Sequence, residues 1–211
     1  MNHALFPREA TVLSPGSFLF PGLALARAAD FQNAVKHAAG AAPFRRVVTP
    51  GGRPLSVRIT NMGSWGWVSD RRGYRYEPTD PRTGRAWSPI PRDLSDFARA
   101  AAARAGFPGF VPDACLINLY APGAKMAPHV DRDEKDFSQP IVSVSLGLPA
   151  VFLWGGPNRS DRVRRVPLED GDAVVWGGPA RLYYHGVAPI QAGRHPLWGE
   201  RRINLTFRKA G

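Results

Sequence analysis

The chain has 211 residues, a length that suits one domain and can bury a core without disulfides or a structural zinc. Its single cysteine, Cys115, excludes an intrachain disulfide and a cysteine zinc cluster, and we expect a small buried residue in a reducing cytoplasm. The net charge of +11 favours a polyanionic partner such as nucleic acid, although an arginine-rich composition that reflects a high-GC genome explains it equally well.

Residues 1–42 are expected to form an N-terminal extension with one strand and one helix. Residues 18–29 are apolar enough to resemble a signal-peptide core, but Pro21, Gly22 and Arg27 interrupt them and no basic cluster precedes them. The stretch is also too short to cross a bilayer. We interpret it as a strand that runs into a helix over 24–38. The sequence therefore predicts no export signal, no membrane anchor and a cytoplasmic location.

Residues 43–92 are rich in proline, glycine and aromatic residues, which is typical of hairpins with long loops. A second helix is predicted over 94–105, capped by Asp93 and ended by Gly106. From residue 114 onward short strands alternate with turns, as in a β-sandwich or jelly roll. The strands are expected at 116–120, 141–148, 151–154, 164–168, 173–176, 185–190 and 202–208.

The segment His129-Val130-Asp131, with His185 farther along the chain, points to a metal centre. Two imidazoles and one carboxylate are the ligands of a facial triad on non-haem Fe(II), which leaves three coordination positions open. On a strand, residues i and i+2 point to the same side, so His129 and Asp131 can face one metal. The third ligand then requires a fold that brings two strands together.

The segment 202–208 alternates polar and apolar residues without a break. As a strand, it places Arg202, Asn204, Thr206 and Arg208 on one face. In an ordinary half-buried strand that face would meet water. On the inside of a β-cavity, the two guanidinium groups would bind a small dianion in bidentate fashion. The sequence does not decide which face is inside, but the metal set nearby favours the inward orientation.

Taken together, these residues resemble the AlkB family of Fe(II)- and 2-oxoglutarate-dependent dioxygenases, and its bacterial DNA-repair members in particular. The likeness begins at about residue 43 and continues to the end of the chain. His-x-Asp alone is a weak signal, whereas the set of matching blocks is highly specific. The blocks are 49–52, 112–125, 129–134, 140–150, 171–178, 184–186 and 202–208.

The resemblance implies a mainly β fold with flanking helices, a double-stranded β-helix (jelly roll) with an N-terminal nucleotide-recognition lid. The single domain 1–211 would comprise the extension 1–42, the lid 43–92 and the catalytic core 93–211. Fe(II), 2-oxoglutarate and O2 are the implied cofactors. The implied residues are His129, Asp131 and His185 for iron, Asn118, Tyr120, Arg202, Asn204 and Arg208 for 2-oxoglutarate, and Trp67, Tyr74, Asp133 and Arg159 for the flipped base.

The resemblance also implies an activity, the oxidative demethylation of 1-methyladenine and 3-methylcytosine with release of formaldehyde and succinate. We expect a monomer that acts on methylated DNA, single-stranded by preference, with RNA as an alternative. Both lesions are cations, so Asp133 would favour them over neutral bases. Arg53 and Arg58 depart from the family pattern, and we expect them to alter strand or sequence preference rather than the chemistry.

Less specific interpretations stay open for several of these residues. Asp133 could pair with Arg132 or Lys135 at the surface, and Trp67 and Tyr74 could be core aromatics of a hairpin. Asp161 and Arg162 are expected in a solvated loop. For the whole chain, the alternatives are a non-catalytic nucleic-acid-binding jelly roll and a related oxygenase that acts on protein or on a metabolite.

Overall fold

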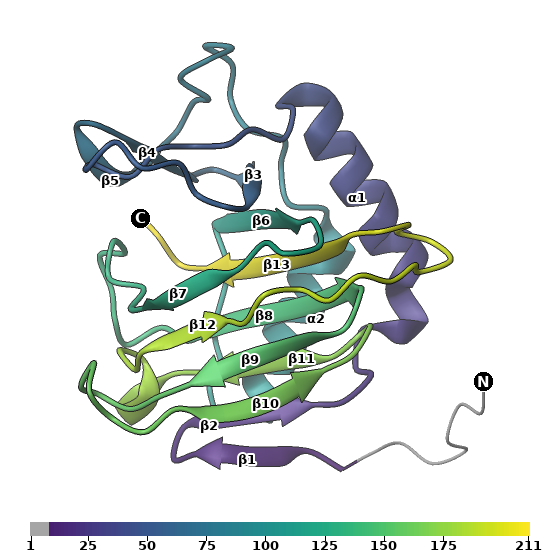
Figure 1. Cartoon of the computed structure of the whole chain (residues 1–211), viewed down its shortest axis with the longest axis vertical. Helices are drawn as coiled ribbons and strands as arrows, with labels where there is room; N and C mark the ends of the chain where they lie inside the picture. Colours follow the sequence, from purple (N-terminus) through teal and green to yellow (C-terminus); the bar gives the residue numbers. More distant parts are fainter. Residues whose placement is uncertain (1–8) are drawn as a thin grey trace.

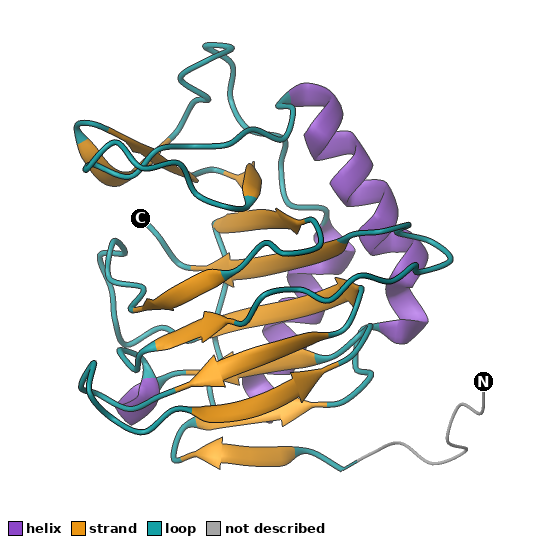
Figure 2. Ribbon diagram, in the orientation of Figure 1, coloured by secondary structure: helices purple, strands orange, loops and turns teal. Residues whose placement is uncertain are grey.

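The computed structural model describes residues 9–211, so the start of the expected N-terminal extension lies outside the described residues. The fold has three layers, with two helices on the outer face of a large sheet and a smaller sheet against its other face (Figures 1 and 2). Strands dominate, as the jelly-roll prediction required. Within residues 9–211, no helix is long and apolar enough to span a membrane.

The large sheet has seven strands in the order β1-β2-β11-β8-β13-β6-β3. Strand β13 lies between β8 and β6, and each of its residues is buried. Both faces of β13 are therefore covered, one by the helices and the other by the cavity between the sheets. The strands are β1 (Thr11–Ser14), β2 (Ser17–Phe20), β3 (Arg58–Gly63), β6 (Ala114–Tyr120), β8 (Ile141–Gly147), β11 (Ala173–Trp176) and β13 (Arg202–Arg208).

The small sheet has four strands in the order β10-β9-β12-β7. They are β7 (Met126–His129), β9 (Ala150–Trp154), β10 (Arg164–Leu168) and β12 (His185–Val187). Two expectations for this sheet were wrong. A strand that carries both His129 and Asp131 was expected, but β7 ends at His129; its Pro128 suits the edge position that β7 occupies. Strand β12 ends at Val187 instead of continuing to residue 190.

Helix α1 (Ala28–Ala41) and helix α2 (Arg92–Arg104) cover the large sheet because each has an apolar stripe at helical spacing. The buried residues are Phe31, Ala34, Val35 and Ala38 in α1 and Leu94, Ala98, Ala101 and Ala102 in α2. Their starts differ from the prediction. The 3-10 helix η1 (Leu25–Arg27) precedes α1, and α2 begins after Pro91, so Asp93 lies in the first turn and caps nothing.

The predicted lid segment divides between two structures. Strand β3 is the edge of the large sheet, whereas β4 (Gly66–Asp70) and β5 (Gly73–Glu77) form a separate hairpin beside that edge (Figure 1). Trp87 anchors the base of this region, because its buried indole donates a hydrogen bond to the carbonyl of Glu77 over 2.9 Å. Trp67 of this hairpin donates a hydrogen bond to Asp133, which lies in the loop that follows β7.

Candidate metal and co-substrate site

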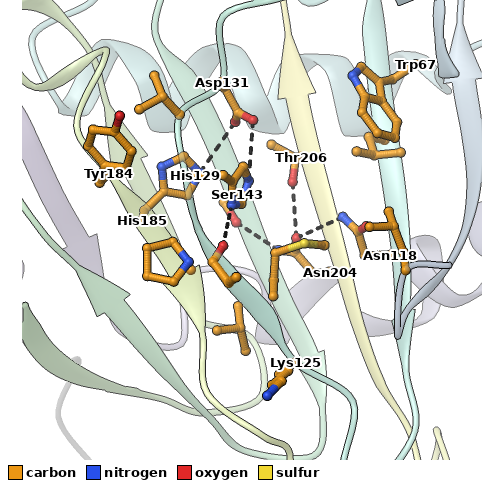
Figure 3. Close-up of a pocket in the computed structure, with 18 of the residues that line it drawn as sticks. Trp67, Asn118, Lys125, His129, Asp131, Ser143, Tyr184, His185, Asn204 and Thr206 are labelled. Atoms are coloured by element: carbon orange, nitrogen blue, oxygen red, sulfur yellow. Dashed lines mark hydrogen bonds and ion pairs between the residues drawn. The ribbon is translucent and has the colours of Figure 1, made fainter. Parts of the chain in front are cut away.

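The three predicted metal ligands meet where β7 and β12 run side by side in the small sheet. His185 lies directly opposite His129 in the strand register, and Asp131 follows two residues after β7 has ended. One ligand atom from each residue lies within 4.8 Å of the others. The convergence agrees with the sequence prediction, but Asp131 reaches the site from the loop and not from a pleated strand as expected. The three side chains face one another in Figure 3.

Hydrogen bonds orient both imidazoles in the same way. Nδ1 of His129 lies 2.9 Å from the carbonyl oxygen of Ala127, and Nδ1 of His185 lies 3.0 Å from that of Tyr183. Each Nδ1–H therefore donates to a carbonyl two residues earlier, which leaves both Nε2 lone pairs facing Asp131. Desolvation of its ring, with a smaller contribution from the neighbouring His185, lowers the pKa of His129 to about 4. A neutral imidazole is the form that binds a metal.

A close approach of the two strands makes this register possible. The ladder between β12 and β7 shifts between His185 and Val187, as at a β-bulge. A Cβ at Gly186 would come within 2.6 Å of the Met126 carbonyl oxygen and 3.0 Å of the Pro128 nitrogen. Glycine at 186 thus lets the strand that carries His185 lie against the strand that carries His129.

Asp131 is held ionised by Arg208. Its Oδ2 accepts a hydrogen bond of 2.7 Å from Nη2 of Arg208, and the Nε2 atoms of His129 and His185 lie 3.7 and 3.6 Å from the carboxylate. Burial alone would raise the pKa of Asp131, but Arg208 and the two histidines hold it well below its usual range. A carboxylate that stays charged inside the protein suits a cation at this point.

The floor of the site holds a buried guanidinium that has no counter-ion among residues 9–211. Arg202 is 1% exposed and lies over the ring of Tyr120, with 4.9 Å between its Cζ and the ring centroid. Nη2 donates to the hydroxyl of Ser145, whereas Nε and Nη1 have no hydrogen-bond partner among residues 9–211. Burying an unpaired charge costs free energy on the order of several kcal/mol. A ligand carboxylate fits this place because it would satisfy both free nitrogens.

Next to Arg202, a polar ladder crosses the large sheet from β6 through β13 to β8. Asn204 donates to the Ser143 hydroxyl at 2.8 Å and to the Val144 carbonyl at 3.1 Å, and it accepts from Thr206 at 3.1 Å (Figure 3). Asn118 lies at the end of this ladder, with its buried Oδ1 unpaired among the described residues. The polar face of 202–208 therefore points into the cavity, as predicted.

At the opposite wall, the lid hairpin supplies two stacked aromatic rings. The centroids of Trp67 and Tyr74 lie 5.4 Å apart at an interplanar angle of 20°, and Tyr74 is 45% exposed. Nε1 of Trp67 donates a hydrogen bond of 2.7 Å to Oδ2 of Asp133. Tyr74 is thus not a core aromatic, whereas Trp67 is half-buried and packs against the hydrophobic cluster that includes Ile59 and Tyr120. Burial raises the pKa of Asp133, and the Trp67 hydrogen bond opposes that rise.

Asp133 forms no ion pair with Arg132 or Lys135, so the surface-pair interpretation of this carboxylate was wrong. The solvated-loop interpretation of Asp161 was incomplete. Its carboxylate accepts a hydrogen bond of 2.8 Å from the backbone of Asn158 and shapes the turn that carries Arg159.

A single cavity of about 690 Å3 collects the residues that the sequence singled out. Its wall includes each residue predicted for iron, 2-oxoglutarate and the flipped base, together with Arg53 and Lys125; Arg58 is exposed on β3 and does not line the cavity. Sequence reasoning missed Tyr76, Glu134, Ser145, Arg181 and Tyr184. Glu134 lies in the matching block 129–134 but was given no role, and the residue type of Arg181 does not indicate burial, because charged residues in loops are ordinarily exposed.

Comparisons with known proteins agree with this site. The sequence model of the 2OG-Fe(II) oxygenase superfamily matches residues 16–208. Alpha-ketoglutarate-dependent dioxygenase AlkB of Salmonella typhimurium is 51% identical over 94% of this chain and 92% of that protein. The AlkB homolog of Caulobacter vibrioides is 46% identical over 93% and 88%. The solved structure of OsALKBH1 superposes with a TM-score of 0.84 at 29% identity, covering 95% of this chain and 100% of that one.

The fold and the superfamily match define a dioxygenase that uses Fe(II), 2-oxoglutarate and O2. A His-Asp-His donor set of the kind such enzymes need is present. Within that class, the chain belongs to the AlkB family.

Proposed function

We propose that this enzyme oxidatively demethylates nucleobases in nucleic acid, with 1-methyladenine and 3-methylcytosine in single-stranded DNA as preferred substrates. The observation that carries the proposal is the position of Asp133. Its carboxylate lies in the wall of the metal cavity and is fixed by Trp67, which stacks on Tyr74. A flat cationic ring beside these groups would gain both stacking and charge attraction. We also propose that the enzyme acts as a monomer in the cytoplasm.

His129, Asp131 and His185 would hold Fe(II), with Arg208 keeping Asp131 ionised. Arg202 would pair with the distal carboxylate of 2-oxoglutarate, which its free Nε and Nη1 are placed to bind. Tyr120 and Asn118 would flank that carboxylate. When bound, iron, 2-oxoglutarate and O2 would supply the oxidation, which would convert 2-oxoglutarate to succinate and CO2 and the methyl group to a hydroxymethyl group that would leave as formaldehyde.

The protein itself would orient the base and exclude water. A base must leave its stack before its methyl group can reach the cavity, and a methylated base that cannot pair costs less to extrude. Trp67 and Tyr74 would receive the ring, and Asp133 would discriminate against the neutral, undamaged base. Around the cavity, Arg53, Lys125 and Arg159 are exposed cations that would hold the flanking phosphates.

Formaldehyde and succinate release from a panel of methylated single- and double-stranded DNA and RNA oligonucleotides would test the proposal. We expect stoichiometric release of both products from single-stranded DNA. His129→Ala should abolish release, whereas His37→Ala, an exposed histidine on α1, should have no effect. Demethylation that survives His129→Ala would refute the metal assignment.

The same panel separates the competing functions. Tight binding of methylated oligonucleotide without succinate would indicate a non-catalytic binding protein. Succinate release that no oligonucleotide stimulates would point to a protein or metabolite substrate. A higher rate on methylated RNA would exchange the DNA preference for an RNA preference and leave the chemistry unchanged.

A further inference from the structure

A buried network of charged and polar groups joins the lid hairpin to the metal and co-substrate site. At its centre Glu134 is 5% exposed, and it lies between Arg181, which is 2% exposed, and Arg208, which is 5% exposed. Nη2 of Arg181 donates a 3.0 Å hydrogen bond to Oε2 of Glu134, and Nε of Arg208 lies 3.4 Å from Oε1. Partly satisfied buried charges are costly, so such a network needs each of its contacts.

Arg181 links two connections of the chain, the one that precedes the strand with His185 and the loop that carries Asp131. It follows the 3-10 helix η2 (Gly178–Ala180), between β11 and the strand that carries His185. Its Nη1 donates to the backbone carbonyl of Asp131 over 2.8 Å, and its Nε donates to the carbonyl of Gln139 over 3.0 Å. The loop that carries Asp131 is thereby held at both ends by one side chain.

Tyr76 extends the network into the lid. This residue is on β5, and its hydroxyl donates a hydrogen bond of 2.7 Å to Oε1 of Glu134. The hydroxyl oxygen of Tyr76 also accepts a hydrogen bond of 3.2 Å from Nη1 of Arg208, and Nη2 of Arg208 donates to Asp131. One phenol oxygen therefore connects the hairpin to the arginine and the carboxylate of the site. Burial raises the pKa of Tyr76, so its hydroxyl stays protonated and can donate.

We propose that Tyr76 is a positioning residue that couples the lid hairpin to the metal and co-substrate site through Glu134, Arg181 and Arg208. Metal and 2-oxoglutarate add contacts to Asp131 and Arg208, which already hydrogen-bond to each other, and Tyr76 transmits the added order to the hairpin that receives the base. The proposal deepens the proposed function, on which it rests for the identity of the site. It requires only that ligands at the site and order in the hairpin share a free energy of coupling.

Strand β5 provides a matched control for this proposal. Tyr74 lies two residues before Tyr76 on the same strand, and no hydrogen bond joins its hydroxyl to another group within residues 9–211. Tyr76→Phe and Tyr74→Phe each remove one phenol oxygen from the same hairpin. Only the first change should affect the coupling, because only that oxygen contacts Glu134 and Arg208.

The test uses the full chain with Mn(II) in place of iron, so that binding occurs without turnover. In the wild-type protein, Mn(II) with 2-oxoglutarate should slow amide hydrogen exchange across β4 and β5. Tyr76→Phe should remove that added protection and weaken 2-oxoglutarate binding, measured by calorimetry, by about tenfold. Tyr74→Phe should match the wild type in both measurements. If Tyr76→Phe also matches it, the proposal is overturned.

A second pair of variants tests the frame behind Tyr76. Arg181→Met should lower Mn(II) affinity by about 10- to 100-fold, the range expected for groups that orient metal ligands. Arg181→Lys, which keeps the ion pair with Glu134, should recover part of the loss, whereas a purely structural role would lower thermal stability and leave the Mn(II) affinity of the folded protein unchanged. If Arg181→Met does not fold, the Tyr76 pair still decides the matter.

These readouts are independent of the substrate. If the wild-type protein releases no formaldehyde from the oligonucleotides but Tyr76→Phe uncouples the hairpin, the proposed function fails and the coupling stands. If formaldehyde is released and Tyr76→Phe behaves like Tyr74→Phe, the proposed function stands and the coupling fails.

Discussion

The floor of the cavity and its lid are built on opposite principles. The floor consists of central strands whose side chains are buried, such as Arg202 at 1% exposed, and these side chains are oriented before any ligand arrives. In the lid, Tyr74 is 45% exposed and is held by a stacking contact. We therefore expect the binding of metal and co-substrate to depend on the buried core, and the choice of base and strand to depend on the more exposed hairpin and rim.

The largest effect is expected from the floor. Arg202→Met should weaken 2-oxoglutarate binding by at least about 30-fold, because truncating one partner of a buried charge pair costs about 2–5 kcal/mol or more. The ligand-free protein should be no less stable than the wild type, since a buried guanidinium without a counter-ion is replaced by an apolar chain. Calorimetry measures the affinity for 2-oxoglutarate, and thermal melts measure the stability of the ligand-free protein. A variant that melts well below the wild type would contradict the stability prediction.

A change in the lid should affect oligonucleotide binding and leave 2-oxoglutarate binding unchanged. Tyr74→Ala removes one of the two stacked rings, so the KM for methylated oligonucleotide should rise by about tenfold, within the roughly 1–3 kcal/mol that stacking contributes per base. The affinity for 2-oxoglutarate should not change. Steady-state kinetics with each substrate varied in turn measure both values. A matching loss of 2-oxoglutarate affinity would erase the distinction between floor and lid.

Asp133 tests the comparison of floor and lid, because it lies in the loop after β7 of the core and its carboxylate contacts Trp67 of the lid hairpin. Asp133→Asn keeps an acceptor for the Trp67 indole while removing the charge, so activity on cationic lesions should fall by roughly tenfold and activity on neutral adducts should change little. Burial raises the pKa of Asp133, so this carboxylate loses its charge at a higher pH than an ordinary aspartate as the pH falls. Wild-type affinity for cationic lesions should therefore decline toward acidic pH, and the Asn variant should lack that decline.

The smallest effect is expected at the rim. Arg53 is exposed at the mouth of the cavity, where it would contact a phosphate. Arg53→Ala should weaken oligonucleotide binding evenly across sequences and reduce the slope of log affinity against log salt by about 1. Arg58→Ala, an equally charged change on β3 that does not line the cavity, is the control. Equal slopes for the two variants would remove Arg53 from the binding surface.

Predictions from periodicity succeeded where the chain pairs in a regular way. The strand 202–208 was predicted with its observed ends, because polar and apolar residues alternate along it without interruption. The strand expected to carry both His129 and Asp131 ends at His129, and Asp93 was wrongly taken as a helix cap because the helix already begins after Pro91. In each case a local signal competed with an arrangement that other parts of the chain impose.

The sequence by itself determined which chemistry is available. It supplies two imidazoles, one carboxylate and two guanidiniums, and the alternation along 202–208 places the two guanidiniums on one face of a strand. Only the tertiary structure decided that the polar face of 202–208 points inward, that Asp131 approaches from beyond a strand end, and that Tyr76, Glu134 and Arg181 meet behind the site. The reason is physical, since strand periodicity is a local property, whereas the burial and pairing of charges depend on residues far apart in the chain.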